Sequence, residues 1–215
     1  MTSDTRVKYN ARSFGHLRGL DRISDAQLAE HLGLYVGYVA QVNALTQELA
    51  EMRETRSASG NSLGLTEATR RFSFEYDGMV LHEHYFGNLK PGGDTPPSER
   101  QALGHALAEA FGSVERWRDE FQAMGALRGV GWVILFQEPV TDQLVNVWVG
   151  LHQNGVPVGC RPLLVMDVWE HAFMRDYKAS ERTEYVKAFF RNIDWQTVDR
   201  RHREASEQSS SRTAA

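Results

Sequence analysis

The sequence predicts an α+β fold, because helical periodicity fills its first part and short strand-like runs follow in its second part. The helical pattern and the mixed pattern are separated by residues 91–97, a stretch rich in Pro and Gly that favours a domain boundary. We therefore expect an N-terminal antiparallel hairpin of two helices. It should pack on a C-terminal domain that holds a three-stranded antiparallel sheet and surrounding helices.

The first part reads as two long helices. Ser24 is expected to begin the first one, since a side-chain oxygen can accept the free amide hydrogens of a first helical turn. The apolar stripe of this helix comprises Leu28, Leu32, Tyr35, Val39, Val42, Leu45 and Leu49. It should extend to about Arg56, where the polar segment 57–62 breaks the pattern. A second helix is expected from about Leu65 to Leu89.

The second part alternates helical and extended patterns. Two shorter helices are predicted at 98–111 and 114–126. Three runs of β-branched or aromatic residues bounded by turn residues predict strands at 131–137, 144–151 and 162–167.

Helical periodicity returns after the last predicted strand, and the final segment is low in complexity. We expect three units: a hairpin domain at 1–92, an α+β domain at 93–206 and a disordered tail at 207–215.

Composition limits the classes of function. The chain has 215 residues and a formal charge of −4, without a basic stripe that would indicate nucleic acid as a partner. No stretch approaches about 18 apolar residues, so no membrane span is expected. Cys160 is the single cysteine, which excludes an internal disulfide and fits a reducing compartment. The first residues lack the apolar core of a signal peptide, so we expect a cytoplasmic protein.

Asp167 is the first candidate for chemistry, because it closes an apolar strand, where an ionised carboxylate needs a partner or a cation. His171 follows one turn later, and this pair alone is more typical of a structural hydrogen bond or a helix cap than of a metal site. His31 and His82 each lie on or near the apolar stripe of a long helix, and either is also consistent with an ordinary core histidine. Together, three imidazoles and one carboxylate suit iron, manganese or zinc and allow redox chemistry on a small ligand.

The run AspValTrpGluHisAlaPheMet at 167–174 resembles the signature of the iron/manganese superoxide dismutases, in which the Asp and the His bind the metal. Further segments resemble the same family at 23–31, 37–43, 80–91, 129–135 and 194–195. The resemblance implies one iron or manganese ion per subunit, held by His31, His82, Asp167 and His171. It also implies an oxidoreductase that converts superoxide to dioxygen and hydrogen peroxide.

The chain departs from the family pattern between its first two similar segments, where it is one residue short. A one-residue difference within a helix is what a π-bulge adds or removes, so we expect the family's bulge to be absent. Tyr38 would then lie on the His31 face as the catalytic tyrosine, with Tyr35 as the other option. Trp132 and Trp169 would line the metal site, although both are equally consistent with ordinary buried aromatic residues of the core.

The family also places a glutamine beside the bound water of the metal. Gly78 resembles the manganese-type arrangement, in which this glutamine comes from a loop after a sheet strand. Gln153 is the candidate here, with Asn154 and His152 as alternatives because the spacing to Pro157 is unusual.

The resemblance further implies a homodimer. In the family, the Glu of the TrpGluHis run reaches the ligand His of the partner chain, which predicts contacts of Glu170 with His171 across a two-fold axis. The family has a second interface pair, in which a His one turn after the first ligand pairs across the dimer with a Tyr. In this chain Tyr35 stands in place of that His and Met174 in place of that Tyr.

Two other functions remain open from the sequence. A non-enzymatic relative could keep the fold and serve as a structural or binding protein, which the altered tyrosine spacing and interface pair favour. A metal-dependent hydrolase or oxygenase would need a substrate cleft that sequence does not reveal.

Overall fold

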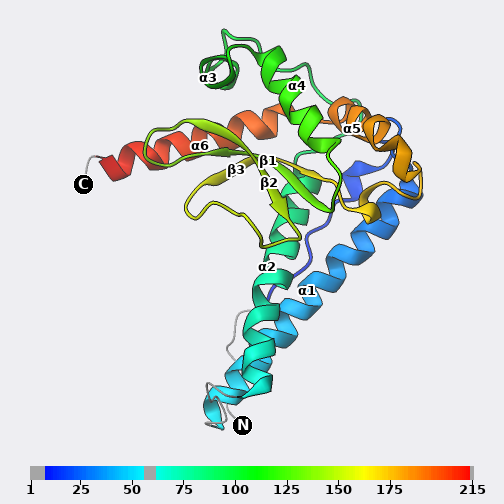
Figure 1. The fold of residues 1–215 in the computed structure, drawn as a ribbon, viewed down its shortest axis with the longest axis vertical. Helices are drawn as coiled ribbons and strands as arrows, with labels where there is room; N and C mark the ends of the chain where they lie inside the picture. Colours follow the sequence, from blue (N-terminus) through cyan, green and yellow to red (C-terminus); the bar gives the residue numbers. More distant parts are fainter. Residues whose placement is uncertain (1–7, 56–61, 214–215) are drawn as a thin grey trace.

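The structure is a computed structural model that describes residues 8–55 and 62–213. Helices α1 (Asp25–Glu54) and α2 (Leu63–Gly87) run antiparallel and form a long arm that projects from the rest of the molecule (Figure 1). Ser24 caps α1 as predicted, its hydroxyl accepting the N–H of Gln27 at 3.0 Å. The predicted break between the two helices lies, for residues 56–61, outside the described residues.

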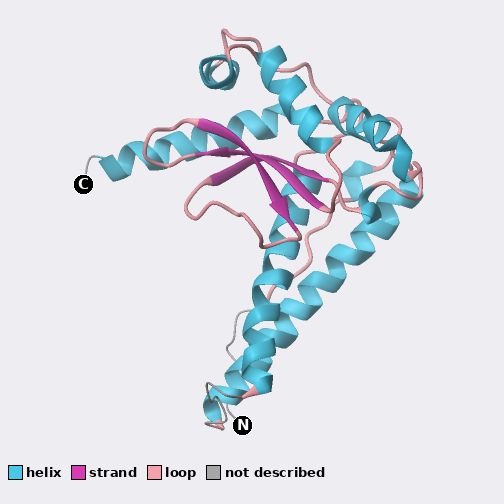
Figure 2. Ribbon diagram, viewed as in Figure 1, coloured by secondary structure: helices cyan, strands magenta, loops and turns pink. Residues whose placement is uncertain are grey.

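The second part contains the expected mixture of helices and strands (Figure 2). Its longer elements are α3 (Ala102–Phe111), α4 (Val114–Gly125), β1 (Gly131–Gln137), β2 (Leu144–Gly150), β3 (Arg161–Asp167), α5 (Arg182–Arg191) and α6 (Trp195–Thr213). A short 3-10 turn, η2 (Glu170–Ala172), follows β3 directly. The predicted α+β fold, with its helical hairpin and three-stranded sheet, is therefore confirmed.

The sheet has the order β2-β1-β3, and both pairings are antiparallel. All seven residues of the central strand β1 are buried, which explains its continuous apolar run. Trp132 lies opposite Asp167 in the register of β1 with β3. The end of β3 is thereby fixed beside the start of β1.

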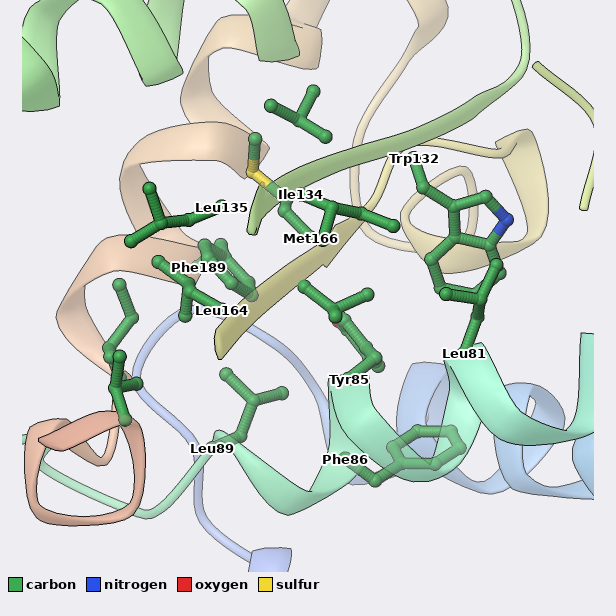
Figure 3. Close-up of a cluster of buried hydrophobic side chains, with 14 of the residues drawn as sticks. Leu81, Tyr85, Phe86, Leu89, Trp132, Ile134, Leu135, Leu164, Met166 and Phe189 are labelled. Atoms are coloured by element: carbon green, nitrogen blue, oxygen red, sulfur yellow. The ribbon is translucent and has the colours of Figure 1, made fainter. Parts of the chain in front are cut away.

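The core fills the space between this sheet, the end of α2 and helix α5. Figure 3 shows its side chains converging from these elements: Leu81, Tyr85, Phe86, Leu89, Trp132, Ile134, Leu135, Leu164, Met166 and Phe189. All of them are buried. Burial of this apolar surface holds the last turns of α2 against β3. The packing thus joins the helical arm to the sheet.

Of the tail predicted to be disordered, residues 207–213 belong to α6 in the structure, and residues 214–215 lie outside the described residues. The physical reason is docking on the turn between β1 and β2. Ser209 is buried and donates its hydroxyl to the carbonyl of Pro139 at 2.9 Å. Ser206 accepts a hydrogen bond from Gln137 at 2.9 Å. Polar residues that would favour disorder in an isolated tail are here bonded to the domain.

Across the described ranges, none of the helices combines the length and apolar character that crossing a bilayer requires.

Candidate metal centre

Four side chains meet where the helical arm joins the sheet. His31 comes from α1, His82 from α2, Asp167 from the last position of β3, and His171 from η2. One donor atom from each residue lies within 4.8 Å of the others. Three of the four residues are fully or almost fully buried, and His171 is partly exposed. The structure therefore brings together all four ligands that the sequence predicted.

Asp167 lies at the middle of this group. Its Oδ2 is 3.0 Å from Nε2 of His31, 3.2 Å from Nε2 of His171 and 3.6 Å from Nε2 of His82. Its other oxygen, Oδ1, accepts the backbone N–H of Trp169 at 2.8 Å. The turn after β3 thus orients the carboxylate so that one oxygen faces the three imidazoles.

His82 gives the most direct sign of a cation-binding site. Its Nδ1 lies 2.6 Å from the carbonyl oxygen of Gly78, and a carbonyl only accepts, so Nδ1 carries the proton. Its Nε2 is therefore unprotonated, and this atom is buried without a hydrogen-bond partner. A buried lone pair directed at a carboxylate and two imidazoles is costly unless a cation binds it. The donor set fits iron or manganese.

Burial also shifts the pKa values of His31, His82 and Asp167, three of the four candidate ligands. Desolvation lowers the pKa of His31 and lowers that of His82 well below its usual value, so both imidazoles are neutral. Burial alone would raise the pKa of Asp167, but the charge and hydrogen bond of His171, together with His31, outweigh it and hold that pKa low. The pKa directions therefore favour neutral rings at His31 and His82 beside an ionised Asp167.

Aromatic side chains surround the four residues. Trp132 meets His82 edge to face at 5.0 Å between ring centroids, and Tyr85 packs on His31 at 5.0 Å. Trp169 stacks on His171 at 5.6 Å. A surface depression of about 730 Å³ reaches His171, whose side chain is 20% exposed. The centre is therefore enclosed by aromatic rings, and of the four grouped residues only His171 lines the surface depression.

Tyr38 lies beside the centre. Its ring packs against His82 at 5.0 Å, and its hydroxyl is 2.8 Å from Nε2 of His152. Helix α1 is α-helical from Asp25 to Glu54 without a π turn, in agreement with the expected loss of the bulge. A Cβ on Gly78 would lie 2.8 Å from the Tyr38 ring, so only glycine leaves room for this tyrosine.

Tyr35, the other predicted option, faces a different part of the core. Its hydroxyl donates to Glu83 at 2.9 Å and accepts the backbone N–H of Arg12 at 2.9 Å. Its ring packs against Phe14 and Phe86. The structure therefore uses Tyr35 to attach the N-terminal segment to α2, and its hydroxyl is bonded away from the four predicted ligands.

His152, an alternative to Gln153 in the sequence reasoning, takes the position next to the centre. Its Nδ1 accepts from Nε1 of Trp132 at 3.1 Å, and its ring stacks on Trp169 at 4.8 Å. Burial lowers the pKa of His152 to about 4, so the ring is neutral. Gln153 instead accepts the backbone N–H of His152 at 3.3 Å.

The reason for this difference is the turn after β2. Leu151 has a φ of 52°, in the left-handed region, and Gly150 and Asn154 form a bridge around it. This tight turn leaves His152 fully buried and Gln153 partly exposed. The unusual spacing to Pro157 was the only sign of it in the sequence.

The comparisons with known proteins agree with this geometry. Residues 99–201 match the family model described as iron/manganese superoxide dismutases, C-terminal domain. The chain is 39% identical over 172 residues to superoxide dismutase [Mn] 2 of Haloferax volcanii, covering 80% of this chain and 82% of that protein. It is 36% identical over 195 residues to superoxide dismutase [Fe] of Aquifex aeolicus, covering 88% and 90%. A superoxide dismutase [Fe] of Cupriavidus metallidurans is 40% identical over 164 residues, covering 75% and 79%.

Proposed function

The chain belongs to the iron/manganese superoxide dismutase family, and from this premise we propose that it disproportionates superoxide to dioxygen and hydrogen peroxide at a mononuclear iron or manganese ion. The observation that carries this proposal is the buried, unpartnered Nε2 of His82 beside Asp167. Relatives similar over most of the chain are named superoxide dismutases, which makes the protein an oxidoreductase.

His31, His82, Asp167 and His171 would hold one ion in each subunit. When bound, iron or manganese supplies a one-electron couple, through which one superoxide is oxidised and a second is reduced. The aromatic rings around the four ligands exclude bulk water, so the electrostatic interactions of the site are not screened.

Forming hydrogen peroxide consumes two protons, and we propose that Tyr38 and His152 deliver them. The Tyr38 hydroxyl and Nε2 of His152 are 2.8 Å apart. Because Trp132 donates to Nδ1 of His152, the His152 proton lies on Nε2, directed at the Tyr38 oxygen. The hydroxyl hydrogen of Tyr38 is then free for another acceptor. We propose that this pair replaces the predicted use of Gln153.

Gly78 supports the manganese-type arrangement of the surrounding residues, because the Tyr38 ring occupies the space that a larger side chain at 78 would need. The residue that hydrogen-bonds near the metal must then come from the turn after β2, as His152 does. Relatives are named with either iron or manganese, so both ions stay within the proposal.

The two rival functions have less support. A non-enzymatic scaffold gives no physical reason for three imidazoles to surround one buried carboxylate, and the relatives above are named as enzymes. A hydrolase or oxygenase needs room for an organic substrate at the metal. Here aromatic rings pack within 5.6 Å of the histidine rings, which suits a diatomic substrate.

The direct test is metal analysis of the purified protein combined with a superoxide-consumption assay. We expect close to one iron or manganese ion per chain and a consumption rate that is lost when the metal is removed and regained when it is restored. A fully metallated protein, tested with each ion, that consumes superoxide no faster than the free metal would contradict the enzyme proposal.

We also propose a homodimer formed through Glu170 and His171. Nε2 of His171 faces Asp167, so Nδ1 faces away from the ligand group, and a ligating imidazole needs its second nitrogen satisfied. Glu170 is exposed next to it, and both residues line the surface depression, which a second copy would cover.

We also propose that the protein is cytoplasmic. Cys160 is its single cysteine, so the chain contains no internal disulfide, as is typical of proteins from a reducing compartment.

Replacing Glu170 with Ala is expected to weaken the dimer and metal retention together, because the same hydrogen bond would serve both. Sedimentation analysis and metal content, measured on the same sample, check this. Glu181→Ala, an exposed carboxylate on the turn before α5, serves as the control and should change neither. A wild-type protein that is monomeric at micromolar concentration would remove the basis of this prediction.

A further inference from the structure

Gln27 is a buried polar residue that the proposed mechanism does not use. It lies in α1 one helical turn before His31, and only 1% of it is exposed. Its amide nitrogen donates to the carbonyl oxygen of His171 at 2.7 Å, and its amide oxygen accepts the backbone N–H of Arg175 at 3.0 Å. A single side chain thus bonds to both ends of the segment that contains the last predicted ligand.

This segment lacks the support that the other ligands have. His31 and His82 lie within long helices, and Asp167 is paired in the sheet, whereas His171 lies in the three-residue turn η2. The backbone hydrogen bonds of that turn, such as Phe173 N–H to Glu170, stay within it and do not fix its distance from α1. An external contact is needed to place the His171 imidazole opposite His31.

The rings of His31 and His171 contact each other at 5.1 Å between centroids, but a ring contact of this kind does not hold the backbone of the turn. Ser24 and Glu30 also join the start of α1 to the same segment, and neither bonds to His171. Ser24 donates its hydroxyl to Asp176 at 2.6 Å, five residues beyond His171, and both residues are exposed. Glu30 pairs with the Arg175 side chain, and about half of each side chain is exposed to solvent. Gln27 is the buried contact of the three, and it bonds directly to the backbone of His171.

We propose that Gln27 is a positioning residue that fixes His171 relative to His31 and thereby sets metal retention and the symmetry of the ligand field. The proposal rests on the metal site described under the proposed function. An amide suits this role because it donates and accepts at the same time, which the carbonyl of His171 and the N–H of Arg175 require. Without it, the carbonyl of His171 and the N–H of Arg175 would lose the partner that they have in this partly buried contact.

The test compares Gln27→Met with the wild-type holoprotein. Methionine has nearly the same shape but forms neither hydrogen bond. We expect metal transfer to a chelator to become roughly tenfold faster, which is the smaller effect typical of losing a residue that orients a ligand. The visible absorption band of the bound metal should shift, because His171 moves relative to the other three ligands. Gln27→Asn, whose amide is one methylene too short to span both partners, should behave in the same way.

Ser24→Ala is the matched control, since it removes a contact between the same two segments and also the N-cap of α1. It should lower the melting temperature but leave the absorption band and the rate of metal loss close to those of the wild type. The inference is overturned if both Gln27 variants keep the wild-type band and rate, or if Ser24→Ala accelerates metal loss equally. A holoprotein that holds its metal but does not consume superoxide would refute the proposed function alone, because neither readout depends on turnover.

Discussion

His82→Ala is expected to abolish stoichiometric metal binding and, with it, superoxide consumption. The Nε2 of His82 is buried without a hydrogen-bond partner, so removing the ring takes away a donor atom that points at the proposed ion. The ion would keep only three protein ligands, and the aromatic side chains around it would not replace the lost donor, so its binding would be weakened. The same loss is expected for alanine at His31, Asp167 or His171, because each provides a separate bond to the ion.

His84 provides the control, because it lies two residues further along α2 and is not among the four grouped donors. His84→Ala should keep the metal, although its burial beside Arg201 gives the substitution some cost in stability. Metal content per chain, measured by elemental analysis after gel filtration, distinguishes the variants. If His31→Ala retained full occupancy while Glu30→Ala lost the metal, the assignment of the first ligand would be wrong.

The grouping of the four candidate ligands was predictable from the sequence because their spacing follows from regular structure. Asp167 and His171 are separated by one turn at the end of a strand, and His31 and His82 occupy inward positions of two long helices. Periodicity places such residues on a face, and the resemblance to the family identified which of the eight histidines share one site. The packing of α1, α2 and β3 then brings them together as predicted.

The surroundings of the metal were less predictable, because they depend on turn geometry and on contacts between distant residues. The left-handed backbone at Leu151 decides that His152 faces inward, and no pattern of residue types signals this. Gln27 looks like an ordinary residue near a helix start until its partners at 171 and 175 are known. The helical structure at the end of α6 likewise depends on a distant partner, because Ser209 donates its hydroxyl to the carbonyl of Pro139.

Tyr38→Phe is expected to slow turnover while leaving metal content unchanged. The hydroxyl bonds to His152 and does not belong to the ligand group, so its removal affects proton delivery and not metal binding. Burial raises the pKa of Tyr38 to about 12, so the group is a neutral donor at physiological pH. Loss of a positioned proton donor should lower the rate about a hundredfold, the lower end of the usual range. Fast kinetics of superoxide decay at matched metal content measures this.

Tyr35→Phe is the paired control, because it removes a hydroxyl from a neighbouring turn of the same helix. That hydroxyl bonds to Arg12 and Glu83, so the expected cost is about 1 kcal/mol of folding stability with turnover retained. His152→Leu should slow turnover as Tyr38→Phe does, because it removes the other partner of the same hydrogen bond. Gln153→Leu should leave turnover unchanged, because the hydrogen bond described for Gln153 is to the backbone N–H of His152. If Tyr35→Phe slowed turnover and Tyr38→Phe did not, the proton route would run on the other side of α1, and the assignment of His152 would fail with that of Tyr38.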